Sequence, residues 1–295
     1  MAARLARREA ALAARAGQTP EGPAPDLLRI ATWNVNSIRT RADGIERFLE
    51  RTRPDVLCLQ ETRIAEIPPA VRSMLERLGF CSAHAGSGGN GGVAVVARHS
   101  ISEVECSAEC ADAELAREPR YVSCLVGCEP PLRVASVYVP HGRTPGHWHY
   151  DYKLSFLTAL TRRAQSWLDG GESVVVAGDL NVAPTDSDVF HPDAFVGRTH
   201  VSPPERAAFR RFLATGLVDV DVACWGPRAR RFTWWNLGIG YSRNLGMRID
   251  IIGVDEALAE RVVTTWIDHR ERGAQRPSDH AALIADFAPV SASPR

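Results

Sequence analysis

Apolar runs and alternating apolar and polar residues dominate the chain between positions 28 and 288. Alternation with a period of two is typical of strands with one buried face, and short apolar runs are typical of strands buried on both faces. A chain that is so rich in strands must cover several sheet faces. The segments that we expect to form strands are Leu28–Trp33, Asp55–Leu59, Phe80–Ala83, Gly92–Ala97, Tyr121–Val126, Arg133–Val139, Ser173–Ala177, Arg248–Val254, Val262–Ile267 and Ala281–Phe287.

Helical spacing of apolar residues is found in fewer segments. In the first of them, Ile45, Phe48 and Leu49 fall on one face. Many strands and few helices favour an α/β fold of two stacked sheets with helices outside, rather than a doubly wound parallel sheet. The predicted helices are Arg41–Glu50, Pro69–Leu78, Lys153–Leu168 and Pro204–Ala214.

No repeat, long break or low-complexity segment divides residues 28–288, so we expect one domain there. Residues 1–27 are rich in Ala, Pro and Arg and are predicted to be a disordered basic tail, in which Ala2–Ala16 can form a basic helix. Residues 289–295 are predicted to be a C-terminal tail. No apolar run approaches the roughly 18 residues of a membrane span, and no secretory signal is present.

The charges of the chain cancel, with 35 Lys and Arg residues against 35 Asp and Glu residues. A net charge of zero argues against general electrostatic attraction to nucleic acid or to an anionic membrane. The seven cysteines are an odd number in a long chain, which disfavours a disulfide framework. Cys124 and Cys128 fall on the apolar face of an alternating run, so we expect buried thiols there rather than a zinc site.

Polar clusters stand where predicted strands end or begin. Asp179 and Asn181 are two residues apart, so in an extended chain their side chains point the same way. The set is rich in carboxylate and amide oxygens, contains one imidazole and lacks thiolates, which favours Mg²⁺ or Mn²⁺ over zinc. The clustered residues are Asn34, Glu61, Asp179, Asn181, Asp250, Asp279 and His280.

Each cluster taken alone also has a purely structural interpretation. Asp and Asn after a strand often form turns, and a Glu at a strand end is often solvated. Asp250 is different, because a carboxylate within a strand is buried and needs a partner. The occurrence of all the clusters at strand ends favours a shared catalytic site.

Five motifs together resemble the exonuclease III family, the class II abasic-site endonucleases of the endonuclease/exonuclease/phosphatase superfamily. They are Trp33–Arg39, Leu59–Thr62, Gly178–Asp186, Met247–Asp250 and Ser278–His280. The segment Thr199–Ser202 before Glu205 is similar to the bacterial exonuclease III branch. The resemblance covers residues 28–288 and implies a four-layer α/β sandwich with two central, mostly antiparallel sheets flanked by helices.

The resemblance also implies a reaction. The family hydrolyses the phosphodiester 5′ to abasic sites in duplex DNA, with 3′→5′ exonuclease and 3′-phosphatase or phosphodiesterase activities, and uses Mg²⁺, with Mn²⁺ as the alternative. Carried onto this chain, Glu61 would hold the metal, with Asn34 beside it and Asp279 close. The site residues implied near the metal further include Asp179, Asn181 and His280.

The roles carried over are those of acid–base and phosphate chemistry. Asp179, helped by Asn181, would orient and deprotonate the attacking water. His280 would contact the scissile phosphate, with its imidazole oriented by Asp250, and Tyr138 would contact the phosphate near the nucleophile. This agrees with the physical requirement for positive charge and donors aimed at an anion that gains charge in the transition state.

In the family, an aromatic residue and an apolar residue line a pocket for the flipped-out abasic sugar. Here those positions are Trp234 and Met247, joined by Ile249 and Trp235. The alternative is that both tryptophans are core or surface stacking residues.

Basic residues near the motifs are candidates for contacts with DNA phosphates. We predict Arg143 and Arg248 as substrate-binding residues; a surface arginine or a structural ion pair is the alternative for each. Further candidates are Arg39, Arg41, Arg63, Lys153 and Arg243.

We therefore expect a monomeric enzyme of the cytoplasm, associated with the nucleoid, that acts on double-stranded DNA with abasic sites or 3′ ends and not on membranes. Two alternatives stay open. One is a nonspecific DNase or another phosphodiesterase of the same superfamily, and the other is a catalytically silent nucleic-acid-binding relative.

Overall fold

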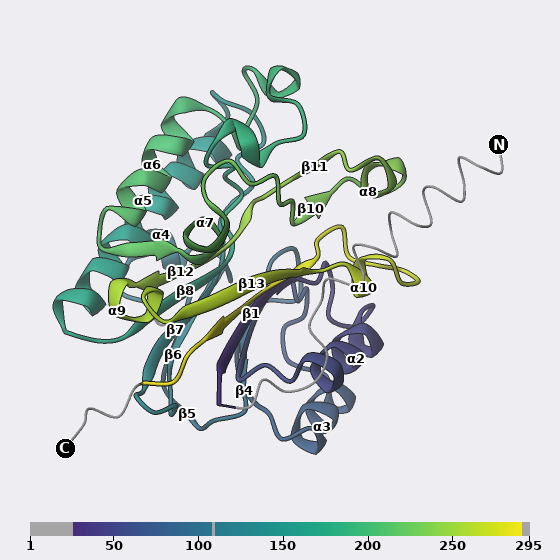
Figure 1. Cartoon of the computed structure of the whole chain (residues 1–295), viewed down its shortest axis with the longest axis vertical. Coiled ribbons are helices and arrows are strands. Elements are labelled where there is room, and N and C mark those ends of the chain that lie inside the picture. The colour runs from purple at the N-terminus through teal and green to yellow at the C-terminus, as the bar shows by residue number, and fades with distance from the viewer. Residues whose placement is uncertain (1–25, 108–109, 291–295) are drawn as a thin grey trace.

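The computed structural model describes residues 26–107 and 110–290, and these form two six-stranded sheets stacked face to face (Figure 1). The predicted tails at 1–25 and 291–295 lie outside the described residues. In spatial order, the first sheet contains β13 (Val262–Asp268), β14 (Ala282–Phe287), β1 (Leu28–Asn34), β2 (Val56–Gln60), β4 (Val93–Ala97) and β3 (Cys81–Ala85). The second contains β5 (Ile101–Cys106), β6 (Tyr121–Val126), β7 (Leu132–Tyr138), β8 (Val174–Asp179), β12 (Asp250–Asp255) and β9 (Leu217–Asp219).

Helices cover the outer face of each sheet. On the first sheet lie α2 (Ala42–Thr52) and α3 (Pro69–Arg77), and on the second lie α5 (Trp148–Asp169) and α6 (Pro203–Leu213) (Figure 1). Ile45, Phe48 and Leu49 of α2 are buried, as their spacing predicts. Within the sheets, only the pairs β1–β2 and β7–β8 are parallel among the described strands. The predicted four-layer, mostly antiparallel sandwich is therefore confirmed.

The remaining elements are short. The hairpin of β10 (Trp234–Trp235) and β11 (Gly246–Met247) carries α8 (Ile239–Arg243) at its end and projects from the layers (Figure 1). The other short helices are α4 (Ala113–Ala116), α7 (Val220–Trp225), α9 (Glu256–Ala259) and α10 (His269–Arg272), with 3-10 turns at Asp186–Asp188 and Pro192–Phe195.

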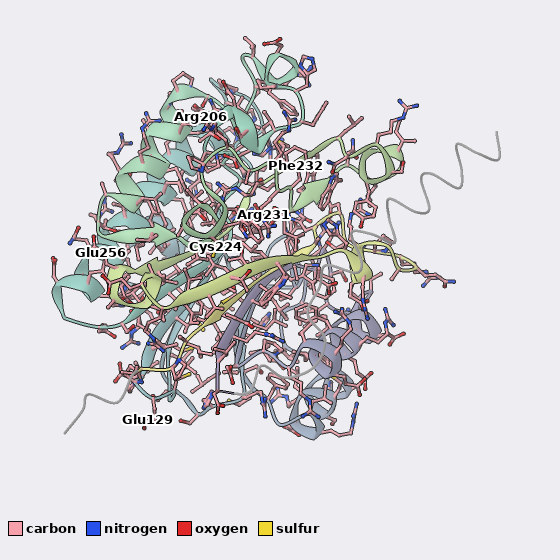
Figure 2. The ribbon with its side chains drawn as sticks, viewed as in Figure 1. Glu129, Arg206, Cys224, Arg231, Phe232 and Glu256 are labelled. Carbon is pink, nitrogen blue, oxygen red and sulfur yellow. The ribbon has the colours of Figure 1, made fainter. Side chains whose placement is uncertain are left out.

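Side chains fill the space between the layers (Figure 2), and the core between the two sheets is aliphatic. Ile30, Val95, Val122 and Leu283 are fully buried there. Cys124 and Cys128 are buried free thiols, as predicted. No helix of the described ranges is long and apolar enough to cross a bilayer.

The strands that the sequence pattern missed are short or lie at an edge. β5 is mostly exposed and has no clean alternation, and β9 has three residues. α5 begins five residues before the predicted start at Lys153, because the side chain of His147 caps it by accepting a hydrogen bond from the His149 backbone N–H.

Candidate active site

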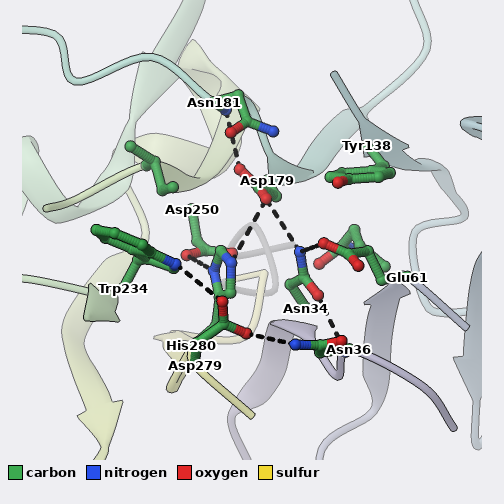
Figure 3. A network of polar contacts seen from close by, with 12 residues as sticks. Asn34, Asn36, Glu61, Tyr138, Asp179, Asn181, Trp234, Asp250, Asp279 and His280 are labelled. Carbon is green, nitrogen blue, oxygen red and sulfur yellow. Dashed lines mark hydrogen bonds and ion pairs between the residues drawn. The ribbon is translucent and has the colours of Figure 1, made fainter. Parts of the chain in front are cut away.

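The sheet register brings the predicted polar residues to one edge of the sandwich (Figure 3). β1 and β2 are parallel neighbours, so Asn34 and Glu61 follow strands that end at the same edge. β14 is antiparallel to β1, which places the residues just before it, Asp279 and His280, at that edge as well. In the second sheet, Asp179 ends β8 and is paired with Asp250 of the antiparallel strand β12.

Asp179, His280 and Asp250 form a buried charged cluster. The Nδ1–H of His280 donates to Oδ2 of Asp250 at 2.8 Å, and its Nε2 lies 3.7 Å from Oδ2 of Asp179. Burial alone would lower the pKa of His280, but the charges of Asp250 and then Asp179 raise it to about 10. The imidazole is therefore charged at neutral pH, and its Nε2–H lies on the side of Asp179.

The pKa of Asp179 is raised as well. Burial is the main cause, and the negative charge of Asp250 adds to it, so that the pKa of Asp179 rises to about 7. The charge of His280 and the hydrogen bond from Asn34 act in the opposite direction. A carboxylate with a pKa near neutrality is suited to accept a proton from water. Oδ1 of Asp250 is buried and has no hydrogen-bond partner among the described residues, while its Oδ2 holds His280.

Two asparagines connect Asp179 with the carboxylates on the other side of the site. Nδ2 of Asn34 donates to Oε1 of Glu61 and to Oδ2 of Asp179, both at 3.0 Å. Asn36 donates through its backbone N–H to Oδ1 of Asn34 and through Nδ2 to Oδ1 of Asp279 (2.9 Å). Asn36 was not among the predicted site residues, although it lies in the same Trp-Asn-Val-Asn motif as Asn34.

The donors of the site suit a hard divalent cation. Burial opposes ionisation of both Glu61 and Asp279. The pKa of Glu61 is nevertheless lowered, because Asn34 and Arg63 donate hydrogen bonds to it. The pKa of Asp279 is lowered by the charge of His280 and by hydrogen bonds from Asn36 and Trp234. Both are therefore carboxylates at neutral pH. Oxygen ligands of this kind fit Mg²⁺ or Mn²⁺. Ligand atoms of Asp179, Asp250 and His280 also lie within 4.8 Å of one another, but Asp250 and His280 are already bonded to each other.

The position of Asn181, two residues after Asp179, predicts an extended backbone. The backbone is instead left-handed there, with a φ of 52°. The turn still joins the two residues, since the Asn181 backbone N–H donates to Oδ1 of Asp179 at 2.9 Å. Nδ2 of Asn181 donates to the carbonyl of Val139 at 2.9 Å. The carbonyl of Asn181 accepts from Nζ of Lys153 and from Nδ1 of His200, both at 2.6 Å, which fixes the turn from behind.

Tyr138 ends β7 beside Asp179 and close to Glu61 (Figure 3). Burial, then the charges of Glu61 and Asp179, raise its pKa well above the usual value, so its hydroxyl is neutral and available as a donor. The guanidinium of Arg120 lies 4.6 Å from the centre of the Tyr138 ring and holds the ring in place. Arg120 was not predicted to take part in the site, and no motif in the sequence marks it.

Comparison with known proteins agrees with this geometry: residues 31–280 match the sequence model of the endonuclease/exonuclease/phosphatase family. The chain belongs to this family. Among curated relatives, exodeoxyribonuclease III of Haemophilus influenzae is 29% identical over 269 residues, which cover 88% of this chain and 100% of the relative.

Two solved structures show the same fold over nearly their full length. An AP endonuclease from Archaeoglobus fulgidus is 33% identical with a TM-score of 0.80, and covers 88% of this chain and 99% of its own. The 3′ phosphatase NExo from Neisseria, solved with product DNA hairpin, is 30% identical with a TM-score of 0.81 and the same coverage.

The apolar pocket predicted from the family resemblance has a counterpart beside Asp279. Trp234 is half-buried and donates through Nε1 to Oδ2 of Asp279 at 3.1 Å. It pairs across the hairpin with Met247 and packs on a buried cluster that contains Met247 and Ile249. That these residues receive a sugar stays a prediction.

Trp235 does not share this surface, so its assignment to the pocket is wrong. Its side chain is 1% exposed, donates to Oδ1 of Asn244 at 3.0 Å and packs against Tyr241. Successive residues of a strand face opposite sides, and Trp234 already takes the side of the site. Trp235 is a core residue.

Arg248 is also not a substrate contact. It is 2% exposed and donates to Asp188 and Asp219, each at 2.6 Å, so it is a buried structural cation. Lys153 is likewise buried. Arg41 donates to the backbone carbonyls of Asn36 and Pro277, and Arg63 pairs with Glu61. Three of the predicted phosphate-contacting arginines are exposed, form no ion pair with the described residues and remain candidates: Arg39, Arg143 and Arg243.

Proposed function

We propose that this protein is a Mg²⁺-dependent DNA repair nuclease that hydrolyses the phosphodiester on the 5′ side of abasic sites in duplex DNA, with 3′→5′ exonuclease and 3′-phosphatase or phosphodiesterase activities. The observation that carries the proposal is the pairing of Asp179 with His280 at 3.7 Å, next to the half-buried indole of Trp234, which packs on the buried side chain of Met247. The names of the relatives support the same reaction class.

The residues divide the work of phosphodiester hydrolysis. Asp179 accepts a proton from the attacking water, and Asn181 and Asn34 keep its carboxylate in place. The charged Nε2–H of His280 and the hydroxyl of Tyr138 donate to the non-bridging oxygens of the phosphate as they gain charge. The bond from phosphorus to the 3′ oxygen breaks as the bond from the water oxygen forms.

A bound Mg²⁺ would be held by Glu61, with Asn34 and Asp279 close, and supplies positive charge to the phosphate and its leaving oxygen. The Trp234 surface provides selectivity, because an abasic sugar loses little stacking when it leaves the helix and fits a tight apolar pocket that excludes a base. We expect a monomer that acts in the cytoplasm, at the nucleoid.

The test uses two duplexes that differ at one position, an abasic-site analogue or an intact nucleotide, each incubated with protein and either Mg²⁺ or EDTA. Metal-dependent incision 5′ to the analogue, absent from an Asp179→Asn preparation, supports the proposal. Equal cutting of both duplexes indicates a nonspecific DNase or another phosphodiesterase, and binding without cutting indicates a silent nucleic-acid-binding relative. Either of these results contradicts the proposal.

A further inference from the structure

A surface near Tyr138 combines an exposed aromatic ring with cations. Trp148, the first residue of α5, is 55% exposed. The guanidinium of Arg117 lies 5.5 Å from the centre of the Trp148 ring and 4.5 Å from that of Tyr152. The rings of His147 and His149 lie 5.5 and 5.3 Å from that of Trp148, the first tilted and the second edge-on. Trp148 is thus held by its neighbours while its ring remains open to solvent.

This surface keeps its positive charge. Arg117 and Arg143 are both exposed, and across residues 26–107 and 110–290 neither forms an ion pair. The nearest acid in the sequence, Glu118, is taken up by Arg120. Two further acids lie close by: Asp151 is exposed one turn further along α5, and Glu114 acts on Tyr152 electrostatically, as Arg117 does. Arg117 and Arg143 are therefore available to bind an anion such as a DNA phosphate.

Packing and hydrogen bonds connect this surface with the catalytic edge. Arg120, three residues after Arg117, packs on the ring of Tyr138 and donates through Nη1 to the Tyr138 carbonyl at 3.5 Å. The loop that follows Tyr138 is tied to α5 by a hydrogen bond of 3.1 Å from the Gly142 N–H to Nδ1 of His149. Tyr138 and Trp148 are therefore joined by one short loop that is fixed to α5, so a DNA strand bound at Tyr138 could extend to Trp148.

An exposed indole with a free arginine beside it fits one ligand chemistry well, an unpaired nucleobase with its phosphate. Bases within a duplex are covered on both faces, so only an unpaired base offers a face for stacking. We propose that Trp148 and Arg117 form a stacking platform for an unpaired base in a single-stranded extension of the DNA. The inference rests on the proposed function and adds to its substrates duplexes with such extensions.

The chain offers a matched control in Trp225. This tryptophan is 51% exposed, and the guanidinium of Arg231 lies 4.6 Å from its ring centre. Here, however, Arg231 is paired with Asp221, and Nε1 of Trp225 donates to Thr265 at 2.8 Å. The region of Trp225 can be found in Figure 2 from the labels of Arg231 and of Cys224, which precedes Trp225 in the chain. The two tryptophans have similar exposure, but of these two only Trp148 has an unpaired arginine beside it.

The experiment measures binding by fluorescence anisotropy in EDTA, so that turnover plays no part. The ligands are one blunt duplex, the same duplex with a single-stranded extension at its 3′ or its 5′ end, and the same extensions built from abasic spacers. We expect one base-bearing extension to increase affinity by about 5- to 150-fold over the blunt duplex. Trp148→Ala should abolish most of this gain, Trp148→Tyr should retain it, and Trp225→Ala should leave it unchanged.

Three outcomes would overturn the platform while leaving the proposed function intact. The first is a wild-type protein that binds the blunt and extended duplexes equally. The second is a Trp148→Ala variant that keeps the gain. The third is an equal effect of Trp148→Ala on base-bearing and abasic extensions, which would make Trp148 a backbone contact only. Wild-type protein that binds none of the duplexes would also overturn the platform, and incision of the abasic duplex in Mg²⁺ tests the proposed function separately.

Discussion

Replacing Lys153 by methionine removes the one lysine of the chain from a position where its side chain has no exposure to solvent. Its ammonium group is paired with Glu205, which is equally buried, and also donates to the Asn181 carbonyl. Removing one member of a buried ion pair leaves an uncompensated charge and typically costs about 3–5 kcal/mol of unfolding free energy.

The structure places the expected cost at the lower end of that range. Without Lys153, the Glu205 carboxylate still accepts from Thr199 Oγ1 at 2.7 Å and from the His200 backbone N–H at 2.9 Å. It also accepts from the backbone N–H and the hydroxyl of Ser202. We therefore expect Lys153→Met to lower the free energy of unfolding by about 3 kcal/mol. For a domain of this size, that corresponds to a fall in Tm of about 6–12 °C.

Urea unfolding measures this loss as a shift of the midpoint at constant slope. Arg77→Met is the control, because Arg77 pairs with Glu46 on the surface, where their side chains are 55% and 35% exposed. That change should cost less than about 1 kcal/mol. The double variant Lys153→Met/Glu205→Gln should lose less than the sum of the single variants, because neither then leaves a lone charge. A loss below about 1 kcal/mol for Lys153→Met would refute the reasoning.

The remaining predictions concern the catalytic cluster and the apolar surface. Asp179→Asn and His280→Gln should each lower turnover by at least about 100-fold with DNA binding nearly intact, and near wild-type turnover would remove that residue from the mechanism. Asp179 acts as a base only when deprotonated and its pKa is raised to about 7, so in pH–rate profiles kcat/KM should rise with pH towards neutrality. Asp250→Asn removes the charge that contributes most to raising the pKa of His280, so the fall in kcat/KM at alkaline pH should move to lower pH. A fall at the same pH as in the wild type would contradict this. Trp234→Ala should reduce the preference for abasic over intact DNA in paired cleavage assays, and unchanged selectivity would locate the sugar pocket elsewhere.

The convergence of the site residues was predictable because strand register is encoded locally. Asn34, Glu61 and Asp179 each come at the end of an apolar run, and the runs themselves are the strongest signal in the sequence. Once the strands stack as two sheets, their polar ends meet at one edge. The backbone conformation at that edge was harder to predict from the sequence. The left-handed turn at Asn181 is held by hydrogen bonds from Lys153 and His200, which lie 28 residues before it and 19 residues after it.

Trp235 is an error that the sequence itself could have prevented. Adjacent residues in a strand cannot both face one pocket, so assigning Trp234 to the site excludes Trp235. Arg248 is different, since the acids that neutralise it, Asp188 and Asp219, lie 60 and 29 residues away in the chain. Only the fold shows that this arginine is buried with two partners, because nothing near position 248 marks them.

The zero net charge therefore carries little information about a DNA substrate. Part of the positive charge is neutralised inside the fold: Arg29 pairs with Asp286 and Arg248 with Asp188 and Asp219, all in buried positions. The arginines that remain exposed without a carboxylate include Arg117 and Arg143, which lie in the sequence on either side of Tyr138. A phosphate approaching the catalytic edge responds to those local charges and not to the sum over the chain, because interactions beyond about 10 Å are screened by salt. The same residue type thus serves either the core or the substrate, and burial decides which.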